Sequence, residues 1–522
     1  MEVRRIFDLH ILLFCHRPSI GLITTTLPQP LTTTGIDIAE DDLTKQAIAS
    51  NGNDDQPRPP PENDNDKNAA VVQEEVEQGL EEEEKEDFQE EIKEEEEEEE
   101  EEEVKQLEGQ PLGTDDKEAK TKANKNESAL ALTHRLTKEI AIKASTLPNG
   151  TQVPVLVTWA NFHYRDFVLN WYEHLNATGC TNVLIGAMDD ALLEVLVNSS
   201  IPTFAMSSGL TLGDFGWGTN SFHKMGREKI SLIQTFTTFG VSVLISDVDT
   251  VWIRDPTEYM ERYPEADVLT SSDHLAASSK DGSLEAPQDA ANSAANIGIM
   301  LFRPSAKPLA AEWVAMLEKD DKIWDQNAFN ELMRRGWDVD DPQRVQRPDK
   351  LFTGYDGKLK FGVLPISTFC SGHTYFIQRL PETLGLEPYV VHATFQYSGT
   401  VGKRNRFRER LLFNDPPEYF QHDTGFISVH NEVPAALKIA VETVKHDMSL
   451  ESTVPHFDLV NPQLTLLRAL FALATITGRA AVLPQLWCGF DRWWAPHAGW
   501  IPGGEFPIPF ECPSDHVLDL EM

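Results

Sequence analysis

The stretch Val241-Ser-Val-Leu-Ile-Ser-Asp-Val-Asp-Thr250 decides the fold that this sequence encodes. Its first five residues form a near-continuous apolar run, which is typical of a parallel strand buried on both faces. Asp247 and Asp249 follow this run directly. Ligands of open parallel sheets bind beyond the carboxyl ends of the strands. The stretch therefore predicts a central strand that carries two carboxylates to a binding edge.

Predicted strands and helices alternate on the N-terminal side of this stretch. This alternation favours an α/β domain with a mostly parallel sheet, which we expect to span residues 150–430. Apolar runs predict strands at 153–158, 182–185, 201–205 and 241–245, and helical periodicity predicts helices at 165–175, 190–197 and 224–239.

Residues 431–522 are expected to form a helical and irregular extension that packs on this domain. Helical spacing covers 435–444 and 463–474, whereas 484–513 is rich in proline, glycine and tryptophan and is expected to be irregular. Cys488 and Cys512 lie in that segment, either as a disulfide or as two unpaired small apolar residues. The five cysteines of the chain show no CxxC or zinc spacing.

The negative charge of the chain is concentrated near its N-terminus. The 522 residues include 84 acidic and 45 basic side chains, and 37 of the acidic ones precede residue 131. Residues 94–103 are ten consecutive glutamates. Such a segment buries too little apolar surface to fold, so 31–130 is predicted to be a disordered acidic stem, with cation buffering as an alternative role. The overall acidity excludes general electrostatic attraction to nucleic acid.

Residues 1–30 have the pattern of a weak signal-anchor. A basic start precedes the apolar run from Ile6 to Cys15, which polar residues interrupt. This run is too short and too polar to span a bilayer. The question of whether residues 1–30 anchor the chain therefore stays open. The absence of 18 consecutive uncharged apolar residues excludes a multi-span membrane protein.

Asp247 and Asp249 are candidate metal ligands. Two hard carboxylates close together suit Mn²⁺ or Mg²⁺. A divalent ion at this edge can bridge the phosphates of a nucleotide-sugar and stabilise the departing diphosphate. A lone D-x-D also occurs in solvated turns, but the preceding strand favours a metal site.

Several sequence blocks, in the same order, resemble plant and algal nucleotide-diphospho-sugar transferases. More specifically, they resemble glycosyltransferase family 77, the group that contains the extensin arabinosyltransferases. The resemblance covers about 150–520. The blocks are Leu244 to Pro256, Phe222 to Lys229, Tyr263 to Asp273, Asn296 to Arg303, Trp324 to Asn327 and His392 to Gln396, with Asp491 to Trp494 and Cys512 to His516 resembling the longer arabinosyltransferase branch.

This resemblance implies a GT-A-like fold, in which a Rossmann-type domain binds a UDP-sugar through a divalent ion. Asp247 and Asp249 match the metal-binding aspartates of that pattern, and His392 matches a histidine that completes the metal coordination. A neutral imidazole is a reasonable third ligand for Mn²⁺. Alternatively, His392 is a structural histidine after the predicted strand 388–391.

Other polar residues are candidates for holding the nucleotide. Lys224 and Arg227 lie near the start of a predicted helix and are expected to hold the diphosphate, unless they are solvated surface cations. Lys403 opens a basic stretch and is expected to neutralise the leaving diphosphate, unless it is solvated or ion-paired. Thr158 and Asn161 are expected to follow the first strand, where they would read the base or ribose or simply cap a turn.

Asp325 and Gln326 are the candidate sugar-facing pair. The Asp325 carboxylate would orient the acceptor hydroxyl or stabilise a cationic sugar, or else it is an aspartate favoured by the dipole of a helix start. Asp273 is expected to contact donor or acceptor. Asn296 and Gly298 are expected to bring backbone close to the sugar, with simple strand packing as the alternative.

Together these features predict a metal-dependent, retaining glycosyltransferase of the Golgi lumen with a type II membrane anchor. By resemblance, the donor is UDP-arabinofuranose and the acceptor is a hydroxyproline-linked arabinoside of a cell-wall glycoprotein. Two alternatives stay open. One is a xylosyl- or galactosyltransferase acting on a wall polysaccharide, and the other is a non-catalytic lumenal binding protein with the same fold. The intact set of Asp247, Asp249, Asp325 and His392 favours an enzyme.

Overall fold

A computed structural model of the chain describes residues 128–206, 220–287, 295–320, 323–337, 349–443, 450–491 and 507–520. The predicted signal-anchor and nearly all of the predicted acidic stem lie outside these residues, and the predicted domain limits stay predictions. Two short helices, α3 Ala129–Thr133 and α4 Lys138–Ala144, precede the expected start of the domain at 150.

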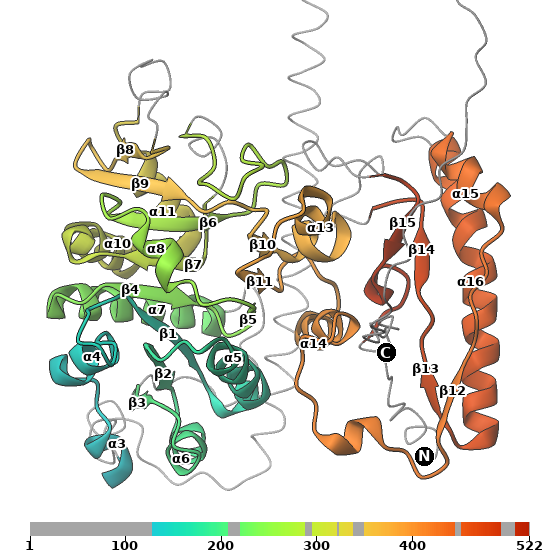
Figure 1. Ribbon diagram of the computed structural model, residues 1–522, viewed down its shortest axis with the longest axis horizontal. Coiled ribbons are helices and arrows are strands. Elements are labelled where there is room, and N and C mark those ends of the chain that lie inside the picture. Colours follow the sequence, from blue (N-terminus) through green and yellow to red (C-terminus); the bar gives the residue numbers. More distant parts are fainter. Residues whose placement is uncertain are drawn as a thin grey trace, which may run out of the picture. The chain divides into compact units, whose positions relative to one another are not determined.

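An eight-stranded sheet in the order β3-β2-β1-β4-β7-β6-β9-β8 forms the centre of the α/β domain (Figure 1). The first four strands of that order are parallel to one another, and β6 is parallel to β9. The strands β7 and β8 run antiparallel to their neighbours. The predicted α/β class with a mainly parallel sheet is therefore confirmed. The strands are β1 Val155–Ala160, β2 Val183–Ala187, β3 Thr203–Ala205, β4 Val243–Ser246, β6 Val268–Ser272, β7 Ala295–Phe302, β8 Phe352–Gly354 and β9 Leu359–Val363.

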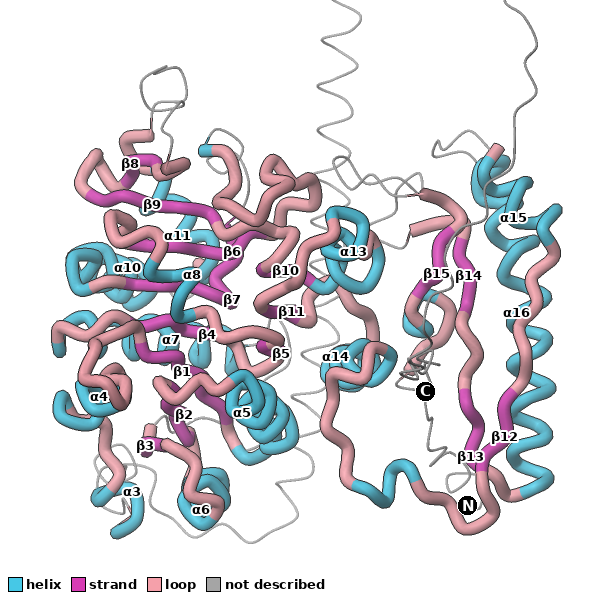
Figure 2. Tube along the Cα trace, viewed as in Figure 1, coloured by secondary structure: helices cyan, strands magenta, loops and turns pink. Residues whose placement is uncertain are grey.

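Helices pack on both faces of this sheet, as Figure 2 shows. Side chains of β1 alternate between the two faces: Val155 and Val157 join one buried core, and Leu156 joins the other. Because both faces are covered, the strands read as continuous apolar runs rather than as alternating ones. The helices of the first core are α4 Lys138–Ala144, α7 Asn220–Phe239, α10 Lys307–Lys319 and α11 Asp325–Arg334, and those of the second are α3 Ala129–Thr133, α5 Arg165–Thr178, α6 Asp190–Asn198 and α8 Thr257–Glu261.

A small three-stranded sheet continues from the end of β4. It consists of β5 Thr250–Trp252, β10 Phe369–Ser371 and β11 Val390–His392. The strands β5 and β11 are antiparallel, and their register places His392 opposite Thr250. The helices α13 Leu380–Leu384 and α14 Gly399–Glu409 flank β11 in the sequence. This sheet brings residues that are some 140 positions apart to the end of β4.

Residues 426–520 contain helices and two small sheets, and the first of these strands lies just before the expected start of the C-terminal extension at 431. The helices are α15 Ala435–Glu442 and α16 Leu450–Thr477, and the strand pairs are β12 Phe426–Ser428 with β13 Ala480–Val482 and β14 Leu486–Cys488 with β15 Phe510–Cys512. The expectation that 484–513 is wholly irregular is wrong, because β14 and β15 form an antiparallel pair. The disulfide alternative for the two cysteines is confirmed, since Cys488 and Cys512 are bonded across these strands.

Helix α16 is, among the described residues, the one helix long and apolar enough to cross a membrane by length and composition. Part of its surface is packed within the protein, since Leu467 and Leu470 are buried in a core with Leu486 and Phe510. The helix also contains Pro455 and Pro462.

Candidate functional site

The turn that carries the two aspartates is fixed by buried hydroxyl groups. The Ser246 hydroxyl lies 2.6 Å from that of Thr250, which donates to the backbone oxygen of Asp247 at 2.8 Å. The indole nitrogens of Trp171 and Trp252 both donate to the Ser246 oxygen. Because the hydroxyl and indole groups that make these bonds belong to buried side chains, we expect them to hold the turn in one conformation, with the two carboxylates projecting from it.

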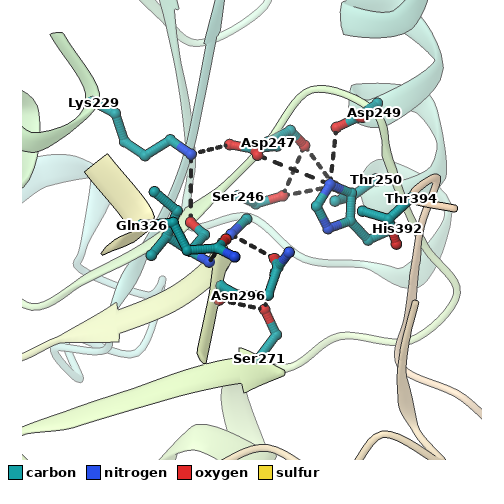
Figure 3. Close-up of polar contacts among 12 residues, drawn as sticks. Lys229, Ser246, Asp247, Asp249, Thr250, Ser271, Asn296, Gln326, His392 and Thr394 are labelled. Carbon is teal, nitrogen blue, oxygen red and sulfur yellow. Dashed lines mark hydrogen bonds and ion pairs between the residues drawn. The ribbon is translucent and has the colours of Figure 1, made fainter. Parts of the chain in front are cut away.

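Three predicted metal ligands converge at this turn (Figure 3). His392 Nε2 lies 3.3 Å from Asp249 Oδ1 and 3.9 Å from Asp247 Oδ2. One ligand atom from each of the three residues lies within 4.8 Å of the others. The backbone bond from Ala393 N to Asp249 O, at 3.0 Å, ties the end of β11 to the turn. The tertiary structure therefore brings His392 to the two aspartates, which lie more than 140 positions earlier in the sequence.

Two lysines compensate the charge of the aspartates. Lys229 Nζ lies 2.8 Å from Asp247 Oδ1, and Lys403 Nζ lies 2.8 Å from Asp249 Oδ2. The Lys229 side chain is only 5% exposed and its ammonium lies over the Trp159 ring. A buried ammonium requires such a carboxylate partner. The site thus holds two acids, one imidazole and two cations in contact.

The electrostatics of the two aspartates differ. Burial raises the pKa of Asp247 despite the opposing effects of Lys229 and His392. Burial also opposes the charge of Asp249, but Lys403 and His392 outweigh it and lower the pKa of this carboxyl well below its usual range. For His392, the neighbouring Asp249 outweighs burial and raises the pKa of the imidazole. Asp249 is therefore the more strongly ionised of the two carboxylates.

A second polar group extends from the turn to α11. Gln326 Nε2 donates to Asp273 Oδ2 at 3.0 Å, and Asn296 Nδ2 donates to Asp273 Oδ1 at 2.9 Å. The Asn296 Oδ1 accepts from Gly298 N, and Gly298 O in turn accepts from Asp247 N. Burial raises the pKa of Asp273, and the two amide donors oppose this rise. A continuous hydrogen-bonded path therefore joins the sugar-facing candidates to the metal-binding candidates.

Gly298 allows β7 to approach His392 closely. A Cβ atom at this position would lie 2.2 Å from His392 Cε1 and 2.7 Å from Nδ1. The expected proximity of Gly298 to the sugar stays a prediction, and the structure adds that this glycine lies against the imidazole.

Gly298→Ala is expected to displace His392 and to weaken Mn²⁺-dependent UDP binding. Overpacking a rigid core also costs about 1–3 kcal/mol of unfolding free energy. Calorimetric UDP titration with and without Mn²⁺, together with thermal unfolding, checks both effects. Gly362→Ala on β9 is the matched control, because its Cβ would meet Leu269, Leu284 and Leu351 in an apolar core of the same sheet. It is expected to lower stability only, and equal losses of UDP binding in both variants would contradict the assignment.

Asp325 opens α11 and lies against α7. Its Oδ2 would be 2.4 Å from a Cβ atom on Gly226, one helical turn before Lys229. Its Oδ1 accepts from the backbone of Gln326, and its backbone oxygen accepts from Trp313. Asp325 therefore has a carboxylate held at the first turn of α11, and both interpretations made from the sequence remain compatible with this position.

Four other sequence candidates lie on β1, directly after it, or on α7. Thr158 lies within β1 and is fully buried, so the expectation that it follows the strand is wrong. The strand extends to Ala160 because both of its faces are covered. Asn161 does follow β1 and is buried at the start of a short 3₁₀ turn. Lys224 is exposed on α7, and Arg227 is half-buried on the same helix. Their roles toward a nucleotide stay predictions.

Lys229 is the site residue that sequence reasoning missed. It belongs to the stripe of α7 that faces the sheet, since Ile233 and Phe236 at helical spacing are fully buried. A lysine within an apolar stripe signals a buried anionic partner. That partner is Asp247, which no periodicity in the sequence identifies.

The donor set fits a divalent cation. Two carboxylates on one turn and an imidazole at the end of β11 match the ligands that Mn²⁺ accepts in proteins. Lys229 and Lys403 now supply the positive charge that such an ion would bring. The chemistry available at this edge is therefore the binding of a metal ion together with an anionic ligand.

Residues 178–407 match the sequence model of a family described as nucleotide-diphospho-sugar transferase. Among characterised proteins, the chain is 46% identical over 370 residues to the arabinosyltransferase XEG113 of Arabidopsis thaliana. The aligned region covers 70% of this chain and 55% of that protein. It is 24% identical over 122 residues to the beta-arabinofuranosyltransferase RAY1 of the same plant, and this aligned region covers 23% of each protein. The chain thus spans about half the length of the first relative and about a quarter of the second.

Solved structures show only a distant likeness. The glycosyltransferase GlyE of Streptococcus pneumoniae is 12% identical, with a TM-score of 0.30 over 56% of this chain and 72% of that one. A score this low supports no conclusion about the present chain.

Proposed function

This chain carries a nucleotide-diphospho-sugar transferase domain, as its sequence blocks predicted, and from this premise we propose that it is a metal-dependent, retaining arabinosyltransferase. One observation carries the proposal. Asp247, Asp249 and His392 meet at the end of a central parallel strand, with Lys229 and Lys403 beside them. Retention follows from the family resemblance.

Asp247, Asp249 and His392 would hold the divalent ion, Mn²⁺ or Mg²⁺. When bound, the ion would neutralise charge on the diphosphate of the donor. Lys403 is half-buried and already directed at the site, so its ammonium is placed to contact a diphosphate oxygen and stabilise the leaving group. Lys229 would keep Asp247 oriented from beneath the turn.

The sugar would face the group that Asp273, Asn296 and Gln326 form. Their side chains are hydrogen-bonded to one another and to rigid strands, which suits the recognition of sugar hydroxyls. The Asp325 carboxylate would stabilise positive charge on the sugar or orient the acceptor hydroxyl. The donor diphosphate would help to deprotonate the acceptor in a front-side attack. Among the described residues we assign no covalent nucleophile.

The identity of the donor rests on the relatives. Two characterised proteins with matching sequence are named as arabinosyltransferases, which favours UDP-arabinofuranose. The proposed acceptor is a hydroxyproline-linked arabinoside of a cell-wall glycoprotein. We further propose a Golgi lumenal enzyme with a type II anchor within residues 1–30, and the disulfide Cys488–Cys512 supports an oxidising compartment.

The direct test is UDP release from a panel of UDP-sugars by the full-length chain, with Mn²⁺ and with chelator. Release from UDP-arabinofuranose alone, and only with metal, supports the proposal. Release from UDP-xylose or UDP-galactose instead would replace the donor but keep the reaction. Metal-dependent UDP binding without turnover of any sugar, even when hydroxyproline arabinosides are added, would favour a non-catalytic binding protein. If the chain neither binds UDP nor turns over any UDP-sugar, the proposed site is wrong.

A further inference from the structure

Helix α14 carries Lys403 to the site but has little stability of its own. Its sequence, Gly399 to Glu409, includes two glycines and the four cations Lys403, Arg404, Arg406 and Arg408. Like charges three or four residues apart repel each other on a helix. The residue before it, Ser398, has a left-handed backbone and makes no capping bond from its side chain. The position of the helix must therefore come from outside partners.

Each cation of α14 has a carboxylate from another segment. Lys403 pairs with Asp249, Arg404 with Asp166, Arg406 with Asp515, and Arg408 with Asp415. Only the Arg406–Asp515 pair is fully buried on both sides. Arg406 lies three residues after Lys403, so the two side chains are neighbours on the helix surface. The buried pair thus sits next to the residue that contacts the site.

The C-terminal segment Ser514–His516 contacts α14 and the residues just before it. Two residues before the helix, the backbone of Tyr397 donates to Asp515 Oδ2 at 3.0 Å. In the middle, Arg406 Nε donates to the same carboxylate at 2.8 Å. At the end, the Ser514 backbone donates to Glu409 at 2.8 Å.

Asp515 is itself held in place from the extension. His516 bridges it to Asp491, with Nδ1 at 3.4 Å from Asp515 and Nε2 at 3.2 Å from Asp491. Asp491 also contacts the buried His373 at 2.8 Å. The Cys488–Cys512 disulfide lies three residues before both Asp491 and Asp515 in the sequence, so it ties together the two segments that carry them. Arg406 and His516 hold the pKa of Asp515 at about 2 despite burial, so the carboxylate is ionised at neutral pH.

We propose that the disulfide-tied segment Ser514–His516 positions α14, and that Asp515 is a positioning residue that acts through Arg406 to hold Lys403 at Asp249. The inference rests on the proposed function insofar as Lys403 contacts the donor diphosphate. Asp515 itself touches no residue of the Asp247–Asp249–His392 cluster among the recorded contacts.

The test compares Asp515→Asn with Asp415→Asn in the full-length chain. Asp415 also neutralises a cation of α14, but it lies only seven residues from Arg408 and does not connect the helix to a distant segment. The first readout is the rate at which Lys403 is acetylated, measured by mass spectrometry. Asp515→Asn is expected to raise this rate several-fold, and Asp415→Asn is expected to leave it near the wild-type rate. An unchanged rate in folded Asp515→Asn overturns the inference.

The second readout is a double-mutant cycle on Mn²⁺-dependent UDP affinity. If Asp515 acts through Lys403, then Asp515→Asn weakens UDP binding several-fold in the wild-type background and has almost no effect in Lys403→Met. Additive losses would show a merely structural role and overturn the inference. A wild-type chain that binds no UDP, with faster Lys403 acetylation in Asp515→Asn, would sink the proposed function while supporting the positioning role.

A milder variant covers the case in which Asp515→Asn does not fold. His516→Gln removes the imidazole that braces Asp515 but keeps the buried ion pair with Arg406. It is expected to raise Lys403 acetylation by a smaller factor in the same direction. A folded His516→Gln protein with wild-type acetylation of Lys403 would again overturn the inference.

Discussion

Asp249→Ala is expected to abolish Mn²⁺-dependent UDP binding and to leave the fold intact. The substitution removes a carboxylate that lies 3.3 Å from His392 and 2.8 Å from Lys403. Loss of even an outer-shell partner of a metal ligand costs about 10–100-fold in metal affinity, so loss of the ligand itself is expected to cost at least about 100-fold. Lys403 is half-buried and retains access to solvent, which spares the protein a buried unpaired charge.

Calorimetric titration of UDP in the presence of Mn²⁺ measures this loss, and circular dichroism checks the fold. Asp166→Ala is the matched control, because Asp166 pairs with Arg404, the neighbour of Lys403 on α14, and lies outside the metal cluster. The control is expected to bind UDP within a few-fold of wild type. If Asp249→Ala binds UDP as tightly as wild type does with Mn²⁺, the metal assignment is wrong.

Asp325→Asn is expected to preserve UDP binding and to depress sugar transfer. Asparagine keeps the shape and the contact of Oδ1 with the Gln326 backbone, but it removes the negative charge. No recorded contact joins Asp325 to the three metal-ligand candidates, so nucleotide affinity is expected to stay near that of wild type. Removing one preorganised electrostatic group typically lowers kcat by about 10²–10³-fold, and we expect a loss of that order.

The measurement is steady-state transfer from the donor that the panel identifies, with UDP affinity determined in parallel. Glu331→Gln, an exposed acid on the same helix α11, is the control for a general loss of charge. Full transfer activity in Asp325→Asn would remove this carboxylate from the chemistry and leave it the role of a helix-start residue.

The elements α7 and β4 could be predicted from the sequence, but the contact between them could not. The helix and the strand were predicted from periodicity with small errors at their ends, since burial on one or both faces leaves a local pattern in the sequence. Lys229 was missed although it lies in a quoted block. Its partner Asp247 is 18 residues away on another element, and only the packing of α7 on the sheet brings the ammonium within 2.8 Å.

Thr158 shows the opposite case, in which a residue was identified from the sequence but its surroundings were not. Thr158 was expected at the binding edge, but β1 continues past it and buries it. The proximity of Gly298 to a sugar stays a prediction, and the contact of this glycine with His392 was not foreseen. Strand ends and close contacts depend on which elements cover a strand, and neighbouring residues in the sequence do not encode that.

The sequence alone determined the parallel α/β core, the carboxylate pair after the central strand and the family of the domain, because each leaves its mark in local residue patterns and ordered blocks. Only the tertiary structure decided that His392 meets Asp249, that Lys403 faces the same carboxylate, and that Asp515 lies behind α14. These contacts join residues that are more than 100 positions apart. They follow from strand register and helix packing, which are set by the summed burial of the whole core rather than by any one segment.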